Sequence, residues 1–296
     1  MMAKARIAII GGSGLYQMEG LTEVEEVEIS TPFGAPSDAI TVGTIEGTRV
    51  AFLPRHGRGH RIPPTKLPVK ANIYALKTLG VERVISVSVV GSLQEEFRPL
   101  DMVVPHQLID RTFQRDHTFF DDGMVAHISF SDPFCPFLSD LLYRTAAGSG
   151  ARVHPGGTYI VMEGPAFSTR AESHMYRRWG ADIIGMTALP EAKLAREAEM
   201  CYSTLACVTD YDCWREATEG VTLEMVVANL QKNVSTSRKV LRDLVTKIPV
   251  GRNCDCGSAL KDAILTPLEL VPQGFKKKMA PIVGKYVRRT RRSVNA

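Results

Sequence analysis

Short apolar runs that end in glycine, proline or a polar residue recur along the chain and predict buried β-strands. These runs are ARIAII, VERVISVSVVGS, DMVVPHQLID, GTYIVMEG, ADIIGM and YSTLACVTD, while AITVGTIEGTRVAFLPRHG predicts two strands joined at the turn EG. Between them, PVKANIYALKTLG, TRAESHMYRRWG and PEAKLAREAEM have the spacing of amphipathic helices. Strands that alternate with helices favour a single α/β domain, with a central mixed sheet flanked by helices.

The longest helical signal runs from residue 222 to residue 248. Apolar residues recur there every three or four positions, from Leu223 to Ile248, and predict one long helix packed on the sheet. Beyond Pro249 the pattern weakens. We therefore expect one domain over residues 1–274, followed by a basic tail over residues 275–296.

This tail accounts for the net charge of +4. It holds eight of the 36 Lys and Arg residues and no acid, so the rest of the chain has 28 basic against 32 acidic residues, a net charge of −4. Such a body is not built to hold nucleic acid, and we expect the tail itself to be solvated. The apolar run IAII near the start is too short for a signal peptide or a membrane span, which favours a cytoplasmic protein without membrane contact.

The six cysteines do not form a recognisable metal motif. Cys254 and Cys256, in NCDCG, lack the two-residue spacer of a zinc site, and the other cysteines are too irregularly spaced to complete one. We hypothesise that this pair can close into a small, strained disulfide, although free thiols are usual in a reducing cytosol. Buried free thiols are expected for the remaining four: Cys135, Cys201, Cys207 and Cys213.

Candidate chemistry lies where the apolar runs end, because ligands of open α/β folds collect at the carboxyl ends of strands. GGSG exposes backbone amides and the Ser13 hydroxyl, but it is neither a full dinucleotide fingerprint nor a P-loop. Arg55 and His56 in PRHG offer donors suited to a tetrahedral oxyanion, and Ser88 and Thr187 can complete its shell. Donors from four strand ends favour free phosphate. The alternatives are a purely structural turn at GGSG, an ion-pairing Arg55 and a packed His56.

Two aspartates, Asp210 and Asp212, follow the last predicted strand in TDYD. Neighbouring acids favour keeping one proton between them, and a proton delivered near N7 of a purine helps that base to leave a sugar. The alternative is that Asp210 caps the following segment while Asp212 is solvated.

Taken together, these segments resemble the S-methyl-5'-thioadenosine phosphorylase family, within the trimeric purine nucleoside phosphorylase group. The resemblance covers about residues 5–248 and rests on IGGSGLY, LPRHGRGH, EGPAFSTRAES, WGADIIGMTALPEAKLAREAEMCY and VTDYDCW. It implies the phosphorylase fold and phosphorolysis of the nucleoside to adenine and S-methyl-5-thio-α-D-ribose 1-phosphate, in methionine and purine salvage. It also implies inorganic phosphate as co-substrate, no other cofactor and no metal, and a homotrimer or a hexamer built as a dimer of trimers.

By position, the resemblance implies roles for particular residues. Phosphate would be held by Ser13, Arg55, His56, Ser88, the backbone amide of Val89, and Thr187. The nucleoside would contact Phe167, Met186, Asp210, Tyr211, Asp212 and, from a neighbouring subunit, His127, while Ser168 and Leu223 would tune selectivity. A methylthioinosine phosphorylase or a broad purine nucleoside phosphorylase is a close alternative. A dinucleotide-dependent oxidoreductase and a non-catalytic nucleotide-binding subunit are distant ones.

Overall fold

The computed structural model describes residues 4–12, 15, 18, 20–215 and 223–287 as one α/β domain around a mixed sheet. Its strands are β1 (Ile7–Gly11), β2 (Thr22–Val27), β3 (Ile40–Ile45), β4 (Thr48–Pro54), β5 (Arg83–Ser92), β6 (Met102–Val104), β7 (Gln107–Arg111), β8 (Val153–Pro155), β9 (Thr158–Met162), β10 (Ile183–Gly185) and β11 (Cys201–Asp210). Its helices are α1 (Val69–Thr78), α2 (Pro136–Ala147), α3 (Arg170–Arg178), α4 (Ala188–Glu197), α5 (Leu223–Lys247), α6 (Gln273–Lys278) and α7 (Ala280–Val287), with short 3-10 turns η1 (Pro64–Lys66) and η2 (Asp255–Ser258). The predicted fold class is confirmed.

Strand β5 is the centre of the sheet, because three strands pair with it. β1 and β11 run parallel to β5, and β10 runs antiparallel to it. The sheet continues through β1, β4, β3 and β2 on one side and through β10, β9 and β7 on the other, while β11 leads to β6 and β8. Since β4 is parallel to β1, the carboxyl ends of β4, β1, β5 and β11 share one edge of the sheet.

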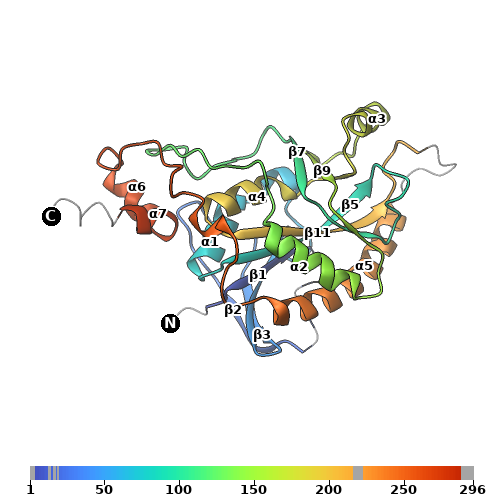
Figure 1. Ribbon diagram of the computed structural model, residues 1–296, viewed down its shortest axis with the longest axis horizontal. Coiled ribbons are helices and arrows are strands. Elements are labelled where there is room, and N and C mark those ends of the chain that lie inside the picture. Colours follow the sequence, from blue (N-terminus) through green and yellow to red (C-terminus); the bar gives the residue numbers. More distant parts are fainter. Residues whose placement is uncertain (1–3, 13–14, 16–17, 19, 216–222, 288–296) are drawn as a thin grey trace.

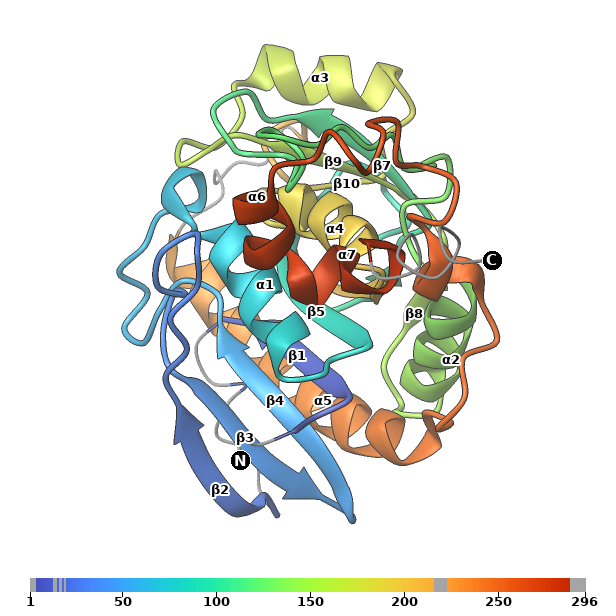
Figure 2. The ribbon, with the colours of Figure 1, turned by 90° about the vertical axis from the view of Figure 1, so that its left-hand side faces the viewer.

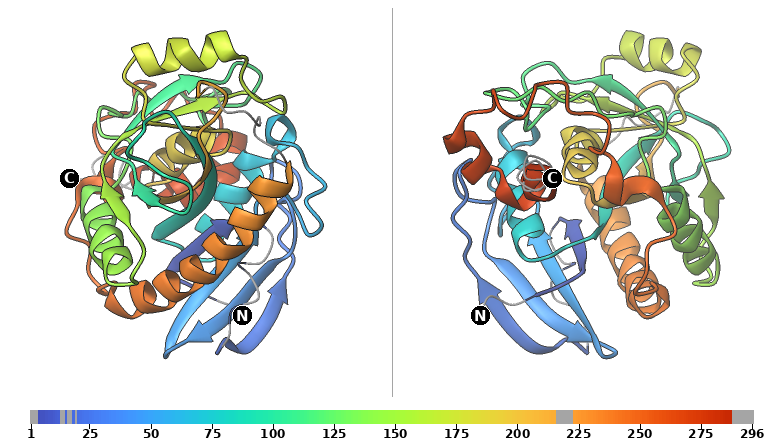
Figure 3. Two further views of the ribbon diagram at one scale, coloured as in Figure 1. Left: turned by 90° about the vertical axis from the view of Figure 1, so that its right-hand side faces the viewer. Right: turned by 60° about the vertical axis from the view of Figure 1, so that its left-hand side comes forward.

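Helices cover both faces of these central strands. Figure 2 shows α1 and α4 in front of the strands, and the left view of Figure 3 shows α5 and α2 across the opposite face. Successive residues of β1 divide between the two cores, with Ala8 packed toward α1 and α4 and Ile9 toward α2 and α5. A strand buried on both faces needs apolar residues throughout, which is why β1, β5 and β11 appear in the sequence as continuous apolar runs.

The carboxyl-terminal segment is folded, in contrast to the solvated tail expected from residue 275. Helices α6 and α7 pack outside α1, with Phe275, Ile282 and Val283 buried (Figure 2). The Tyr74 hydroxyl of α1 donates to the carbonyl oxygen of Lys278 at 2.7 Å. The lysines dominate the composition of this segment and conceal apolar residues that bury one face of each helix. The domain therefore continues through residue 287, past the expected boundary at 274.

Besides α6 and α7, the sequence prediction lacked β2, the short β8 and α2. β2 is an exposed edge strand, TEVEEV, so it has no apolar run to reveal it. α2 carries Leu138, Leu142 and Ala146 at intervals of four residues, a signal sufficient to predict it. The predicted long helix is α5, confirmed within one residue at each end. Among the described helices, none is both long and apolar enough to cross a membrane.

Candidate active site

Asp210 and Asp212 lie together at the carboxyl end of β11, against the end of β5 (Figure 1). The two strands are in parallel register up to Val208, and a bulge at Thr209 then places Asp210 beside Gly91. A β-carbon at Gly91 would lie 3.0 Å from Oδ1 of Asp210 and 3.4 Å from the β-carbon of Asp212, so only glycine leaves room for both acids. The bulge therefore turns the end of an apolar strand into a place where two carboxyls converge.

Burial raises the pKa of both carboxyls. Asp210 accepts hydrogen bonds from the Thr209 hydroxyl and from the Asp212 backbone N–H, each at 2.8 Å; these favour its ionised form, but burial outweighs them. For Asp212, burial is again the main cause; the nearby Ser173 hydroxyl opposes it, and the Asp210 charge adds to it. Oδ2 of Asp212 and the Ser173 hydroxyl are both buried, and neither makes a hydrogen bond of good geometry in the described part of the chain. An orphaned oxygen of this kind suits a proton or a donor on a ligand.

The alternative role for Asp210 is partly correct, because its Oδ1 holds the turn that leads to Asp212. Asp212 adopts a left-handed backbone conformation with φ of 51°, which Asp tolerates better than most residues. The Val208 carbonyl accepts from the Leu100 backbone N–H at 2.9 Å, and α5 supplies side-chain donors for it and for the next carbonyl. Asn233 donates to the carbonyl of Val208 at 3.0 Å, and Asn229 to that of Thr209 at 2.8 Å. Sequence reasoning missed both asparagines.

Ser88 and Thr187 meet because β10 runs antiparallel to β5. Ile184 pairs with Gly91, so Thr187, three residues further along, comes opposite Ser88, and their hydroxyl oxygens lie 3.0 Å apart. The fully buried Tyr159 hydroxyl approaches both residues, yet no hydrogen bond of good geometry satisfies it. Hydroxyls from three strands or strand ends thus lie close together, and two of them, Ser88 and Thr187, belong to the predicted set.

Arg55 forms a buried ion pair, the alternative that the sequence left open. Its Nε lies 2.5 Å from Oε1 of Glu191 and its Nη2 lies 3.1 Å from Oε2. The same guanidinium donates to Ser86 Oγ at 2.6 Å and to the carbonyl of Val87 at 3.0 Å, joining β4, β5 and α4. These contacts leave one N–H of Nη1 for another acceptor. Glu191 gave no sequence signal, because an acid in the first turn of a helix usually lies at the surface.

His56 is held as a neutral ring. Its Nδ1 lies 2.8 Å from the carbonyl oxygen of Ile62, so this nitrogen carries the proton and donates it. The ring stacks on His60 with centroids 4.2 Å apart. Burial, followed by the charge of Arg55, lowers the pKa of His56 to about 4. At neutral pH its Nε2 is therefore an acceptor, suited to a P–O–H group, whereas the sequence suggested a donor.

Met186 is positioned by buried charges outside the predicted set. Its carbonyl accepts from Nη1 of Arg115 at 2.7 Å, and Nε of Arg115 lies 3.0 Å from a carboxylate oxygen of Glu163. The Met186 side chain packs over Gly164, where a β-carbon would lie 2.5 Å from Sδ. The ion pair and the glycine together fix the turn that carries both Met186 and Thr187.

Other predicted contacts lie at the surface around these groups. Val89 is 38% exposed and Phe167 is 68% exposed, unusual values for large apolar side chains in a folded domain. Ser168 is buried, and its carbonyl accepts from the Cys213 thiol at 3.2 Å, next in sequence to Asp212. The lining expected for a nucleoside is therefore present at the strand ends but open to solvent.

Some predicted residues do not join this group within one chain. The Tyr211 ring packs into the apolar cluster that also holds Trp214. His127 is exposed on a segment that pairs with residues 263–266, toward α6 and α7 and away from the end of β5 (Figure 1). Ser13 lies outside the described residues, as does the side chain of Leu223.

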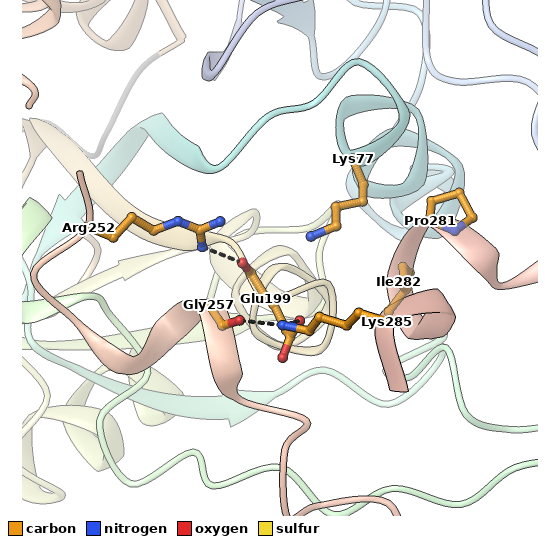
Figure 4. A pocket seen from close by; sticks show the side chains of 7 residues that line it. All are labelled: Lys77, Glu199, Arg252, Gly257, Pro281, Ile282 and Lys285. Atoms are coloured by element: carbon orange, nitrogen blue, oxygen red, sulfur yellow. Dashed lines mark hydrogen bonds and ion pairs between the residues drawn. The ribbon is translucent and has the colours of Figure 1, made fainter. Parts of the chain in front are cut away.

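Two cavities lie apart from the strand ends. One, of about 230 Å³, lies beside α1 and α7; Figure 4 shows Glu199 within it, between Arg252 and Lys285. Burial lowers the pKa of Lys77 at this cavity to about 8. The other, of about 330 Å³, lies between residues 65–71 and 114–116. No predicted site residue lines either one; at the strand ends, the exposed Val89 and Phe167 side chains face solvent in the described part of the chain.

Comparisons with known proteins give consistent matches over nearly the whole chain. Residues 6–246 match the family model described as the phosphorylase superfamily. The chain is 56% identical to the S-methyl-5'-thioadenosine phosphorylase of Gloeobacter violaceus, over 96% of each chain. A methylthioadenosine phosphorylase from an antarctic soil metagenomic library has a TM-score of 0.91 and 50% identity, covering 95% of this chain and 99% of that one. A mutant adenosine/methylthioadenosine phosphorylase from Schistosoma mansoni, in complex with methylthioadenosine, has a TM-score of 0.81 and 34% identity over 87% of this chain and 96% of that one.

Proposed function

This chain belongs to the phosphorylase superfamily, and we propose that it catalyses the phosphorolysis of S-methyl-5'-thioadenosine to adenine and S-methyl-5-thio-α-D-ribose 1-phosphate. The family resemblance expected from the motifs is confirmed by these matches. The observation that carries the proposal is the half-buried pair Asp210 and Asp212, at the same sheet edge as the Ser88 and Thr187 hydroxyls. Phosphorolysis needs both parts, an acid for the departing base and donors for the attacking phosphate.

In the proposed reaction, an oxygen of inorganic phosphate bonds to C1' of the ribose as the bond from C1' to N9 breaks. The bonding pair enters the purine ring, and a proton from the aspartate pair neutralises that charge at N7. The sugar passes through an oxocarbenium-like state that the phosphate charge stabilises, so no enzyme nucleophile is required.

We propose that phosphate lies at the converging hydroxyls of Ser88 and Thr187, next to the Val89 amide. Three further groups would complete its shell: the free N–H of Arg55, the neutral His56 ring and the Ser13 hydroxyl. The buried ion pair of Arg55 with Glu191 supports a positioning role for that arginine, because it fixes β4 against β5 at the residues that precede Ser88.

The aspartate pair also suits adenine. A protonated carboxyl donates to N7 while an ionised one accepts from the 6-amino group, and the orphaned Oδ2 of Asp212 offers such a position. A 6-oxopurine would instead place an oxygen against a carboxylate. We therefore expect methylthioadenosine to be preferred over methylthioinosine. With Phe167, Met186, Ser168 and Leu223 lining the 5' side, we also expect adenosine to be a weaker substrate.

We further propose that the enzyme works as a homotrimer, or as a dimer of trimers, in which His127 reaches a neighbour's site. Support comes from its exposure far from the other site residues of its own chain, and from the open surface around Phe167. Light scattering combined with kinetics tests this, and a fully active monomer would contradict it.

We also propose that the enzyme serves the salvage of methionine and purine, on the same basis as the reaction. The described cysteines are all free thiols, which supports a location in the reducing cytoplasm.

The direct test supplies four nucleosides to the purified protein: methylthioadenosine, methylthioinosine, adenosine and inosine, each with and without inorganic phosphate. Chromatography of the released base and sugar should show adenine and methylthioribose 1-phosphate only when phosphate is present. Rapid cleavage without phosphate to free methylthioribose would identify a hydrolase instead. If no nucleoside is cleaved, the result would favour the alternative of a non-catalytic nucleotide-binding subunit.

Thr187→Val tests the phosphate site separately. Loss of one donor hydroxyl should raise the phosphate KM about tenfold or more while the ratio between methylthioadenosine and methylthioinosine stays constant. Thr145→Val is the matched control, because the Thr145 hydroxyl bonds only within α2, to the Leu141 carbonyl at 2.8 Å. A changed base preference with an unchanged phosphate KM would move Thr187 out of the phosphate site.

A further inference from the structure

Four cysteines come together at the amino end of β11, although the sequence spacing gave no sign of it. The Sγ atoms of Cys135, Cys201, Cys254 and Cys256 all lie within 4.8 Å of one another, and those of Cys201 and Cys254 are 3.4 Å apart. All four are free thiols; Cys254 is half-buried and the others are buried. Neither the isolated buried thiols nor the self-contained Cys254–Cys256 pair expected from the sequence describes this arrangement. We refer to these residues as the four-cysteine cluster.

Three separate parts of the fold build the four-cysteine cluster. Cys135 immediately precedes α2, and its backbone N–H donates to the Tyr202 carbonyl at 2.8 Å, which holds it against β11. Cys201 is the first residue of β11, and Cys254 and Cys256 lie at the start of η2. Strand and helix thus fix two sulfurs, and the segment after α5 brings two more to them.

We propose that the four-cysteine cluster binds one Zn²⁺ ion as a structural site. Zinc bonds thiolate sulfur at about 2.3 Å in a tetrahedron, which places the sulfurs about 3.8 Å apart, and the observed mutual limit of 4.8 Å fits that spacing. Four protein sulfurs complete the tetrahedron, so no position is left for water or substrate. Two disulfides would also use all four sulfurs, so they are the alternative that the test must separate from zinc binding; in the structure all four are free thiols.

Binding requires the thiols to ionise. Zn²⁺ and four thiols give a tetrathiolate complex of charge −2 and release four protons, so affinity should rise with pH. The first turn of α2 presents amide groups and the positive end of its dipole at Cys135, which favours negative sulfur there.

The metal would secure the carboxyl-terminal segment to the core. Residues 249–258 connect α5 to the region that carries α6 and α7, and the four-cysteine cluster joins this connection to β11 and α2. The aspartates lie at the other end of β11, so the metal takes no part in the reaction. Its loss should lower the thermal unfolding midpoint and open the segment beyond residue 249 to proteolysis.

The test uses the full chain, reduced, incubated with Zn²⁺ and freed of excess metal. Elemental analysis and native mass spectrometry should find one zinc per chain, and Co²⁺ in its place should give the intense visible bands of tetrahedral sulfur coordination. Cys256→Ser should weaken zinc binding at least 10–100-fold and remove the stabilisation by zinc. Cys254→Ser, at the half-buried position, serves if Cys256→Ser does not fold.

Cys207→Ser is the matched control. Cys207 lies on the same strand as Cys201 but outside the four-cysteine cluster, and its sulfur is 3.4 Å from the Ser237 hydroxyl, so serine retains a partner. This variant should keep one zinc. Three results would overturn the proposal: a reduced wild-type chain that binds no zinc, cluster cysteines found in disulfides when cells are lysed with an alkylating agent, or equal zinc loss in Cys207→Ser and Cys256→Ser.

Discussion

The acidic residues at the two ends of β11 differ in how fully their carboxylates are paired. Just before its amino end, Glu199 is 2% exposed and fully engaged, with Lys285 Nζ 2.5 Å from one carboxylate oxygen and the Tyr286 hydroxyl 2.5 Å from the other. At the carboxyl end, Asp210 and Asp212 have raised pKa values, and among the described residues one Asp212 oxygen has no hydrogen bond of good geometry. A satisfied charge network holds a structure together, whereas an orphaned buried acid costs stability and is typical of a functional site.

This contrast predicts that substitutions at the two ends have separable effects. Changes at the carboxyl end should lower activity with little loss of stability. Changes at the amino end should lower stability with little loss of activity.

The largest effect is expected for Asp212→Ala. Loss of an acid that serves the departing base should lower kcat/KM for methylthioadenosine about 10²–10⁴-fold. The unfolding midpoint should hold or rise, because the orphaned oxygen is removed. Asp140→Ala is the control, since Asp140 is 55% exposed and pairs only with Arg144 at the surface of α2. Unchanged steady-state kinetics in Asp212→Ala would remove the acid from the mechanism.

Glu199→Ala is expected to lower stability at the amino end of β11. It leaves the buried Leu260 amide without its acceptor, at a cost of about 1–3 kcal/mol, whereas Lys285 is 51% exposed and keeps the Gly257 carbonyl. Denaturant unfolding measures that loss, and kcat/KM well below the unfolding midpoint should stay within a few-fold of wild type. Glu269→Ala, an exposed acid in the same carboxyl-terminal region, should change neither. A large activity loss without destabilisation would reverse the comparison.

The pH dependence of kcat sharpens the contrast. The base leaves with a proton from the aspartate pair, so kcat should fall as pH rises through the raised apparent pKa of that pair, by up to about tenfold per pH unit. His56, with a pKa of about 4, stays neutral through this range and contributes no change above about pH 5. The measurement is kcat at saturating substrate across this pH range. Control incubations at each pH show whether the enzyme stays active, so that a fall in kcat is not caused by inactivation. A kcat that rises across the same range would show that the ionised pair is the active form.

The smallest effect is expected for Asn233→Ala. The Val208 carbonyl keeps the Leu100 N–H as a donor, so removing the second donor should cost about 1 kcal/mol and, by loosening the bulge, lower kcat modestly. Ser235→Ala, at an exposed position of α5, is the control. An effect on stability with none on kcat would show that the bulge does not orient the aspartates.

Sequence reasoning selected the candidate site residues because they end apolar strands. A strand buried on both faces is visible as a continuous run, and the polar residue that ends it marks the edge of the sheet. Asp210 after β11 and His56 after β4 were found in this way. The bulge at Thr209 was not predictable, because it depends on the register between β11 and β5 and not on either strand alone.

Partners from distant segments were missed for a related reason. Glu191 and Arg115 are charged residues within or beside amphipathic elements, where the usual position is the surface, and only the fold shows them buried against Arg55 and Glu163. The four-cysteine cluster joins three segments, and no local spacing identifies it. Local pattern predicts elements and their ends, whereas pairing across the fold requires the topology.

The central claim is that two acids at the end of β11 read adenine. It is tested most directly by the ratio of kcat/KM for methylthioadenosine to that for methylthioinosine, in competition, for the wild type and Asp210→Asn. A buried acceptor facing O6 leaves a polar contact unpaired, at a cost of about 1–3 kcal/mol, so the wild type should prefer methylthioadenosine by about tenfold or more. Asparagine can donate to O6 and N7, so Asp210→Asn should shift the ratio toward methylthioinosine while lowering kcat for the adenine nucleoside. A wild type that prefers methylthioinosine would contradict the claim.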